Sequence, residues 1–295
     1  MKKIKFKNFV ELREKVLKSG KSLPDFLKEY EALNSEQTIE EVVRRMKNAL
    51  NTMKKDIAEG SNKENISRTG LTQGGALKVK KYSLDKSNSL ICPKFTEIIY
   101  STLAVSETNA TMGKIVAAPT AGACGVLPGA LLTVAKYKKI PDDKIIDALF
   151  VAGGFGEVIR NIASLSGARH GCQAEIGSAS AMTAAAIVSL FTDDLGAMES
   201  AAAFALKNLL GLVCDPIGGY VEIPCIKRNV AAAFNAISSA EMALAGIRTV
   251  IPFDEVVLAM KRIGEKMSPT LKETAEGGLA ATPTAKKLMK KFKNE

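Results

Sequence analysis

Apolar residues recur at helical spacing along most of the chain, and several of these segments begin at recognisable signals. The clearest is the segment 38–60, where Thr38 and Glu41 form a capping box and an apolar stripe follows. A proline and two aspartates at 141–143 predict a second long helix, which we expect to run to about Ala163. The same pattern predicts helices over residues 93–106, 175–191, 195–212, 225–245, 253–267 and 283–292.

Alternation typical of strands is rare, and its best example, residues 219–223, is brief. The segments 61–76 and 109–128 contain several glycines and predict long loops, which in a compact domain are usually functional. We therefore predict a mainly α protein with a single helical catalytic domain and long glycine-rich active-site loops. This domain is expected to cover residues 61–295, with residues 1–60 as an N-terminal helical segment packed on it.

Composition narrows the class of protein. The chain has 295 residues, of which 46% are hydrophobic and 24% charged, so we exclude a disordered or collagen-like chain. Aromatic residues reach only 5% and tryptophan is absent, which favours a core of closely packed, alanine-rich helices. The longest uncharged stretch, 115–135, is interrupted by prolines and glycines, so we expect no membrane span. An odd number of cysteines and a charged N-terminus predict reduced thiols and a cytoplasmic location.

The net charge of +10 is concentrated at the two ends of the chain. Residues 1–55 carry 14 basic and 8 acidic residues, whereas 101–250 carry 11 and 12. The last ten residues hold five lysines and one glutamate. A nucleic-acid binder needs stacking aromatics beside its basic stripe, and few are present, so we expect no nucleic acid as partner. Solvated faces or contact with an acidic partner chain are the favoured interpretation, and a nucleic-acid-binding protein is the rival class.

Three of the five cysteines stand at predicted helix ends. Cys172 and Cys225 open helices, whose N-termini favour thiolates, and turn-forming residues after Cys214 allow the chain to fold back. Three soft ligands from separate segments suit an iron–sulfur cluster with one iron left unligated by protein. Structural zinc and ordinary buried cysteines remain alternatives on spacing alone, and Cys92 and Cys124 fit the second of these best.

Three segments carry a resemblance to a known family. They are 109–122 (NATMGKIVAAPTAG), 171–182 (GCQAEIGSASAM) and 214–229 (CDPIGGYVEIPCIKRN). At these motifs the chain resembles the alpha chain of the iron–sulfur-dependent bacterial L-serine dehydratase, also called L-serine ammonia-lyase.

The resemblance implies a cofactor, a fold and a partner. It implies that Cys172, Cys214 and Cys225 hold a 4Fe-4S cluster in an all-helical catalytic domain. It also implies a beta chain, because the family's second domain carries a Ser-Ser-Ser-His-Thr motif that this sequence lacks.

Two departures from the family's pattern stand out. No cysteine follows Cys225, whereas single-chain relatives carry a C-terminal cysteine that caps the cluster. The loop 69–76 (TGLTQGGA) resembles the family's Ser-Gly-Leu-Thr-Gly-Gly-Asp-Ala loop but lacks its acidic residue.

The implied reaction is β-elimination of water from L-serine, which gives pyruvate and ammonia. A Lewis-acidic iron binds the hydroxyl and a general base, expected on the beta chain, removes the Cα proton. A related lyase acting on L-cysteine or L-threonine is the alternative. Backbone amides of glycine-rich turns suit the substrate carboxylate, so the expected substrate-binding residues are Thr69, Gly70, Asn109, Thr120, Ala121 and Gly122.

Five neighbouring residues receive supporting roles. The segment 227–229 (Lys-Arg-Asn) is expected either to balance cluster charge or simply to start a helix. Glu175 is expected to complement a helix dipole. His170, the chain's single histidine, is expected to be structural.

Overall fold

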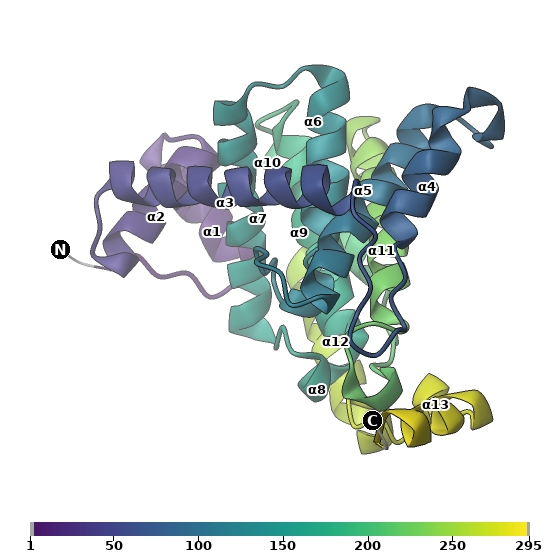
Figure 1. Ribbon diagram of the computed structural model, residues 1–295. Coiled ribbons are helices and arrows are strands. Elements are labelled where there is room, and N and C mark those ends of the chain that lie inside the picture. The colour runs from purple at the N-terminus through teal and green to yellow at the C-terminus, as the bar shows by residue number, and fades with distance from the viewer. Residues whose placement is uncertain (1–2, 294–295) are drawn as a thin grey trace.

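The computed structural model describes residues 3–293 and is built from helices (Figure 1). No β-strand occurs among these residues, which contain only two isolated bridges, Ile66–Gln73 and Cys214–Lys272. The predicted mainly α fold is confirmed. The α-helices are α1 (Phe9–Ser19), α2 (Leu23–Ser35), α3 (Ile39–Gly60), α4 (Gly75–Leu84), α5 (Pro93–Ala110), α6 (Thr133–Lys138), α7 (Asp142–Ile162), α8 (Gly167–His170), α9 (Ser178–Ser189), α10 (Leu195–Lys207), α11 (Cys225–Leu244), α12 (Phe253–Lys266) and α13 (Pro283–Lys293).

Helix α9 lies in the middle of the molecule, with α7, α10 and α11 packed around it (Figure 1). Its residues 178–188 are all buried, and most of them are alanine or serine. A helix buried on every side has no polar face, and small side chains let its neighbours approach closely. The core is therefore an alanine-rich helical bundle, as the composition predicts.

Local signals set the ends of several helices. At the start of α3 the Glu41 carboxylate accepts from the Thr38 N–H (2.9 Å), and the Thr38 hydroxyl accepts from the Glu41 N–H (3.2 Å). Helix α7 begins at Asp142 as predicted, whereas α10 ends at Lys207, earlier than expected. Helix α4 was not predicted, because its N-cap is Gly74, which has no side chain to cap it.

Helices α2 and α3 pack on α7, and glycines in the middle of α7 shape this contact. A Cβ atom at Gly154 would lie 2.6 Å from Leu27 Cδ1, so the close approach of α2 requires a glycine there. A Cβ at the preceding Gly153 would meet nothing within 4 Å. Buried side chains of residues 1–60 and of the remaining chain form one continuous core. The proposed division at residue 60 stays a prediction.

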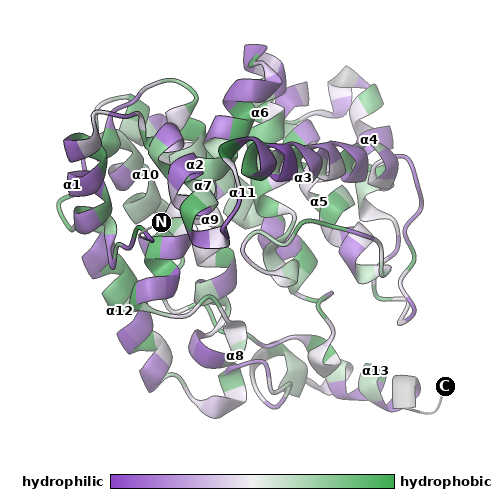
Figure 2. Ribbon diagram, turned by 90° about the vertical axis from the view of Figure 1, so that its left-hand side faces the viewer, coloured by the Kyte–Doolittle hydropathy of each residue, from purple (hydrophilic) through white to green (hydrophobic). Residues whose placement is uncertain are grey.

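Polar residues are frequent on the outer helices α1, α3 and α12, whereas α9 and α10 are mostly apolar or neutral (Figure 2). None of the helices in residues 3–293 combines the length and the apolar character needed to cross a bilayer. This agrees with the expectation from the interrupted uncharged stretches.

One carboxylate of α3 is buried without a hydrogen bond. Asp56 is only 7% exposed, and its Oδ2 has no partner among the described residues. Burial, followed by repulsion from Glu59, raises the pKa of Asp56 to about 6, although Lys55 and Lys114 oppose the rise. Because its environment favours the protonated form, Asp56 should affect stability in a pH-dependent way.

Candidate functional site

The three cysteines expected to bind a cluster come from separate segments, and all are buried. Cys172 lies directly before the short turn that leads into α9, and Cys225 is the first residue of α11. Cys214 lies in the loop after α10, where its N–H donates to the Leu271 carbonyl (2.9 Å). Its own carbonyl accepts from the Glu273 N–H (2.7 Å). The exposed fractions of Cys172, Cys214 and Cys225 are 2%, 3% and 8%.

Electrostatic interaction between the three thiols indicates that they share one site. Burial, followed by the nearby Cys172, raises the pKa of Cys225 to about 12. Burial also raises the pKa of Cys214, to which Cys172 and Cys225 both contribute. Burial raises the pKa of Cys172 to about 11, although the Arg228 guanidinium favours its thiolate. The thiols are therefore close enough to influence one another electrostatically, and a bound metal would be needed to hold all three as thiolates.

The other two cysteines lie elsewhere. Cys92 is the half-buried N-cap residue of α5. Cys124 is buried behind α5, and burial followed by the nearby Asp56 raises its pKa to about 12. Neither is among the groups that shift the pKa values of the three clustered thiols.

The three thiols suit a cluster better than a single ion. Within residues 3–293 no group of three or more His, Cys, Asp or Glu side chains converges closely enough for one metal ion. A four-iron cluster makes a different demand, because each thiolate binds a different iron. Soft sulfur ligands are the set that iron–sulfur clusters take, and the positive Arg228 beside Cys172 compensates negative charge. The donor chemistry therefore fits a cluster held by three cysteines.

Glu175 lies beside Cys214, although the sequence analysis predicts only a helix-dipole role for it. A Cβ atom added to Gly167 would lie 2.9 Å from Glu175 Oε2 and 3.0 Å from the Cys214 sulfur, so these two atoms lie close to each other. Burial raises the pKa of Glu175, and Glu273 adds to the rise, whereas Thr120 and the Gly167 N–H oppose it. A carboxylate three residues after Cys172, in the same turn, is the signal that could have identified it.

The segment 120–125 lies against Glu175 and the start of α11. A Cβ at Gly122 would lie 3.4 Å from Glu175 Oε2, so the glycine leaves room beside the carboxylate. The Asn229 amide donates to the carbonyls of Gly122 (2.8 Å) and Cys225 (2.9 Å), and its oxygen accepts from the Gly125 N–H (3.0 Å). Asn229 thus joins this turn to a cysteine. Of the expected substrate-binding residues, Thr120, Ala121 and Gly122 lie in this turn.

The loop that carries Thr69 and Gly70 is held by one buried carboxylate. Glu222, in the loop between Cys214 and Cys225, is 4% exposed. It accepts hydrogen bonds from the hydroxyls of Ser67 (2.6 Å), Thr69 (2.7 Å) and Thr72 (2.5 Å). We call this group the Glu222 clamp. It fixes the loop 66–73 to the cysteine loop and uses the Thr69 hydroxyl that the sequence assigned to substrate.

A carboxylate from another helix contacts the position where the glycine-rich loop lacks the family's acidic residue. The family's loop has an aspartate where this chain has Gly75. The buried Glu107 of α5 accepts from the N–H groups of Gly75 (2.7 Å) and Ala76 (3.2 Å) and so caps α4. A Cβ at Gly75 would lie 2.8 Å from Glu107 Oε1, so no larger residue fits there without a shift. Asn109, another expected substrate-binding residue, lies two residues further on, in the last turn of α5.

Of the residues 227–229, Arg228 points towards the cysteines. It forms an ion pair with the buried Asp215 (2.9 Å) and donates to the Val213 carbonyl (2.8 Å), beside Cys214. Lys227 is exposed, on the side of Glu107.

His170 is buried against α12, where a Cβ at Gly264 would lie 2.5 Å from the His170 Cβ. Burial lowers the pKa of His170. This tight packing agrees with a structural role.

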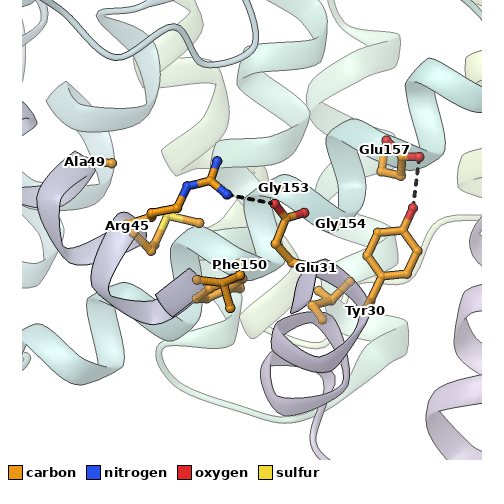
Figure 3. A pocket seen from close by; sticks show the side chains of 11 residues that line it. Tyr30, Glu31, Arg45, Ala49, Phe150, Gly153, Gly154 and Glu157 are labelled. Atoms are coloured by element: carbon orange, nitrogen blue, oxygen red, sulfur yellow. Dashed lines mark hydrogen bonds and ion pairs between the residues drawn. The ribbon is translucent and has the colours of Figure 1, made fainter. Parts of the chain in front are cut away.

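A separate cavity of about 320 Å³ lies between α2, α3 and α7 (Figure 3). Its walls include Phe150 and Gly153, and the Tyr30 hydroxyl donates to Glu157 (3.1 Å) at its edge. None of the cysteines or expected substrate-binding residues lines it. The candidate site is therefore the cysteine group and not this cavity.

Comparison with known proteins gives a consistent family. The family profile described as "Serine dehydratase alpha chain" matches residues 18–280. The chain is 44% identical to the probable L-serine dehydratase, alpha chain, of Bacillus subtilis (strain 168), over 97% of this chain and 95% of the relative. It is 37% identical to the L-serine dehydratase, alpha chain, of Peptoniphilus asaccharolyticus, over 94% of both chains. It is 39% identical to the L-serine dehydratase of Mycobacterium bovis, over 77% of this chain but only 52% of the relative.

Proposed function

The chain belongs to the serine dehydratase alpha chain family, and we propose that it is the alpha subunit of an L-serine ammonia-lyase. Such a carbon–nitrogen lyase eliminates water from L-serine, and the resulting aminoacrylate tautomerises to an imine that hydrolyses to pyruvate and ammonia. The observation that carries the proposal is the grouping of three buried thiols beside Arg228 and Glu175.

We infer that Cys172, Cys214 and Cys225 are the ligands of a 4Fe-4S cluster. When bound, the cluster supplies a Lewis-acidic iron with an open position, which polarises the serine hydroxyl. Arg228 supports the site by placing a positive charge beside Cys172. Because thiolate ligands need a reducing compartment, the enzyme is placed in the cytoplasm.

The protein side chains around the thiols have distinct roles in this proposal. Glu175 Oε2 lies beside Cys214, so we propose Glu175, in place of the base expected on the beta chain, as the group that accepts the Cα proton. The backbone amides at Ala121 and Gly122 bind the substrate carboxylate, and Asn229 holds their turn in place. The Glu222 clamp positions the loop that carries Thr69 and Gly70.

A beta chain is the proposed partner. Relatives of the same length as this chain are named alpha chain, whereas the matched part covers about half of the Mycobacterium bovis enzyme. We propose that a second polypeptide, the beta chain, supplies the counterpart of the part of that enzyme outside the match.

The decisive experiment is iron and sulfide analysis with a visible spectrum of the anaerobically purified protein, alone and with its beta chain. Cys214→Ser should abolish the chromophore, because it removes one of three ligands, whereas Cys92→Ser is the matched control and should keep it. Full colour in both variants would show that the ligand assignment is wrong.

Substrate choice is tested separately. The anaerobic complex is assayed for 2-oxo acid formation from L-serine, L-threonine and L-cysteine. Highest turnover with L-serine is expected, and preference for another amino acid would overturn the proposed substrate. Glu175→Gln keeps the shape of the side chain but removes its basicity, so it should lower kcat by roughly 10²-fold or more without loss of iron.

A further inference from the structure

Helix α13 lies at one edge of the molecule, near α8, and packs on the cysteine loop (Figure 1). Its Met289 side chain covers Gly218, in the loop between Cys214 and Cys225, and leaves no room there for a Cβ. Gly218 also has φ +65°, which favours glycine. Beside this contact lies a cavity of about 590 Å³, which we call the α13 groove and which is lined by Gly218, Ala275, Glu276, Ala280, Ala281, Lys286, Met289 and Lys290.

The α13 groove combines apolar walls with a basic rim. Five of its eight lining residues are alanine, glycine or methionine, and the charged ones are Glu276 and the two lysines of the basic rim, Lys286 and Lys290. These two lysines and their neighbours Lys287 and Lys291 are exposed, and α13 contains no acidic residue. Within residues 3–293 none of the four lysines forms an ion pair. These four lysines outweigh the single Glu276 of the lining, so the groove and its helix are net positive, which favours an acidic ligand.

The segment that forms the groove is tied to the cysteine loop by backbone hydrogen bonds. The Leu279 N–H donates to Asp215 (2.8 Å), next to Cys214. Cys214 itself exchanges two backbone bonds with Leu271 and Glu273. A molecule bound in the α13 groove would therefore lie directly beside the site.

We propose that the α13 groove is the docking site for an acidic, partly apolar segment of the beta chain. This inference rests on the proposed function, which requires a second polypeptide. A second copy of this chain is a poor occupant, because each copy carries a net charge of +10. Nucleic acid is also disfavoured, because none of the residues that line the groove is aromatic.

The experiment measures the affinity of the anaerobic alpha chain for its beta chain at low and moderate salt. Lys286→Glu/Lys290→Glu reverses the rim of the groove and should weaken binding roughly tenfold or more, with a smaller salt dependence. Lys15→Glu/Lys47→Glu has the same charge change at exposed sites outside α13 and should leave affinity nearly unchanged. Equal affinity of the two variants would overturn the proposal.

A further variant separates the groove from general charge attraction. Lys287→Glu/Lys291→Glu changes lysines of α13 that do not line the groove and should weaken binding less. If it weakens binding as much as the rim variant, the groove is not the docking site. Iron content and helical circular dichroism of all variants should equal those of the wild type, which shows that they fold.

The failure of this inference is distinguishable from failure of the proposed function. If the wild-type complex forms through these lysines but does not convert L-serine, the docking site stands and the function is wrong. If the complex converts L-serine and the rim variant binds normally, the function stands and the docking site is wrong.

Discussion

The Glu222 clamp should hold the loop 66–73 in place, and removing its carboxylate tests this directly. Glu222 is buried, and within residues 3–293 its side chain forms hydrogen bonds only with the hydroxyls of Ser67, Thr69 and Thr72. We therefore compare Glu222→Gln, which keeps the shape of the side chain, with Glu222→Ala, which removes every acceptor.

The expected magnitudes follow from the burial of the three donors. Ser67 and Thr72 are buried and Thr69 is half-buried, so Glu222→Ala leaves the Thr72 hydroxyl without a partner or access to water. It also removes the charged acceptor of the Ser67 hydroxyl, which keeps only its hydrogen bond with the Thr69 hydroxyl (3.1 Å) and the one it accepts from the Thr72 N–H. Each such loss costs about 1–3 kcal/mol, and relief of the buried charge offsets part of it, which gives roughly 2–4 kcal/mol in total. Glu222→Gln exchanges charged for neutral hydrogen bonds and should cost about 1 kcal/mol.

The assay is differential scanning calorimetry of the anaerobic protein together with steady-state kinetics of the complex. Glu222→Ala should lower Tm by roughly 5–10 °C and raise KM for L-serine, and Glu222→Gln should lower Tm by only about 2–4 °C. Glu64→Ala removes an exposed carboxylate just before this loop and serves as the control. If Glu222→Ala and Glu64→Ala unfold at the same temperature, the clamp does not hold the loop.

Three further predictions concern stability and the turn at the site. Gly153→Ala should raise Tm, because a glycine inside a helix costs about 0.5–1 kcal/mol relative to alanine and a Cβ at this position meets no other atom. Gly154→Ala should lower Tm, because a Cβ there would collide with Leu27. Shifts of the same sign in the two variants would contradict this reasoning. The pKa of Asp56 is about 6 in the folded protein, whereas an aspartate ordinarily has a pKa of 3.8. The contribution of Asp56 to the free energy of unfolding is therefore complete below pH 3.8 and is lost as the pH rises through 6. Asp56→Asn should therefore stabilise the protein by roughly 1–2 kcal/mol at about pH 8 but not at about pH 4, as measured by urea unfolding, whereas the exposed Asp193→Asn should show no such difference. Asn229→Ala removes the three hydrogen bonds that the Asn229 side chain makes with Gly122, Gly125 and Cys225. This change should lower the free energy of unfolding by about 2–3 kcal/mol and should lower the iron content. An unchanged iron content would show that the turn does not position the cysteines.

The elements that the sequence predicts well are those with local signals. The capping box at Thr38 and the acidic start of α7 each depend on residues within one helical turn, and both helices begin where expected. Helix α4 shows the opposite case. Its first N–H groups are capped by Glu107, which lies 31 and 32 residues further along the chain. No local pattern contains that information.

The candidate site divides in the same way. Sequence motifs singled out Cys172, Cys214 and Cys225 and the glycine-rich turns near them. Spacing alone left zinc and ordinary buried cysteines open, because it does not tell which sulfurs meet. The roles of Glu175 and Glu222 were also missed, because each depends on which loop packs against the carboxylate.

By itself the sequence determined that the chain is helical, where several long helices begin and which family motifs it carries. Those properties follow from interactions between residues a few positions apart, such as caps, apolar stripes and short motifs. Only the tertiary structure decided that Glu222 holds the Thr69 loop, from 153 residues away, and that α13 covers the cysteine loop. Such contacts arise when small-residue helices pack closely and bring distant loops to the same end of the bundle, and no periodic pattern along the chain records them.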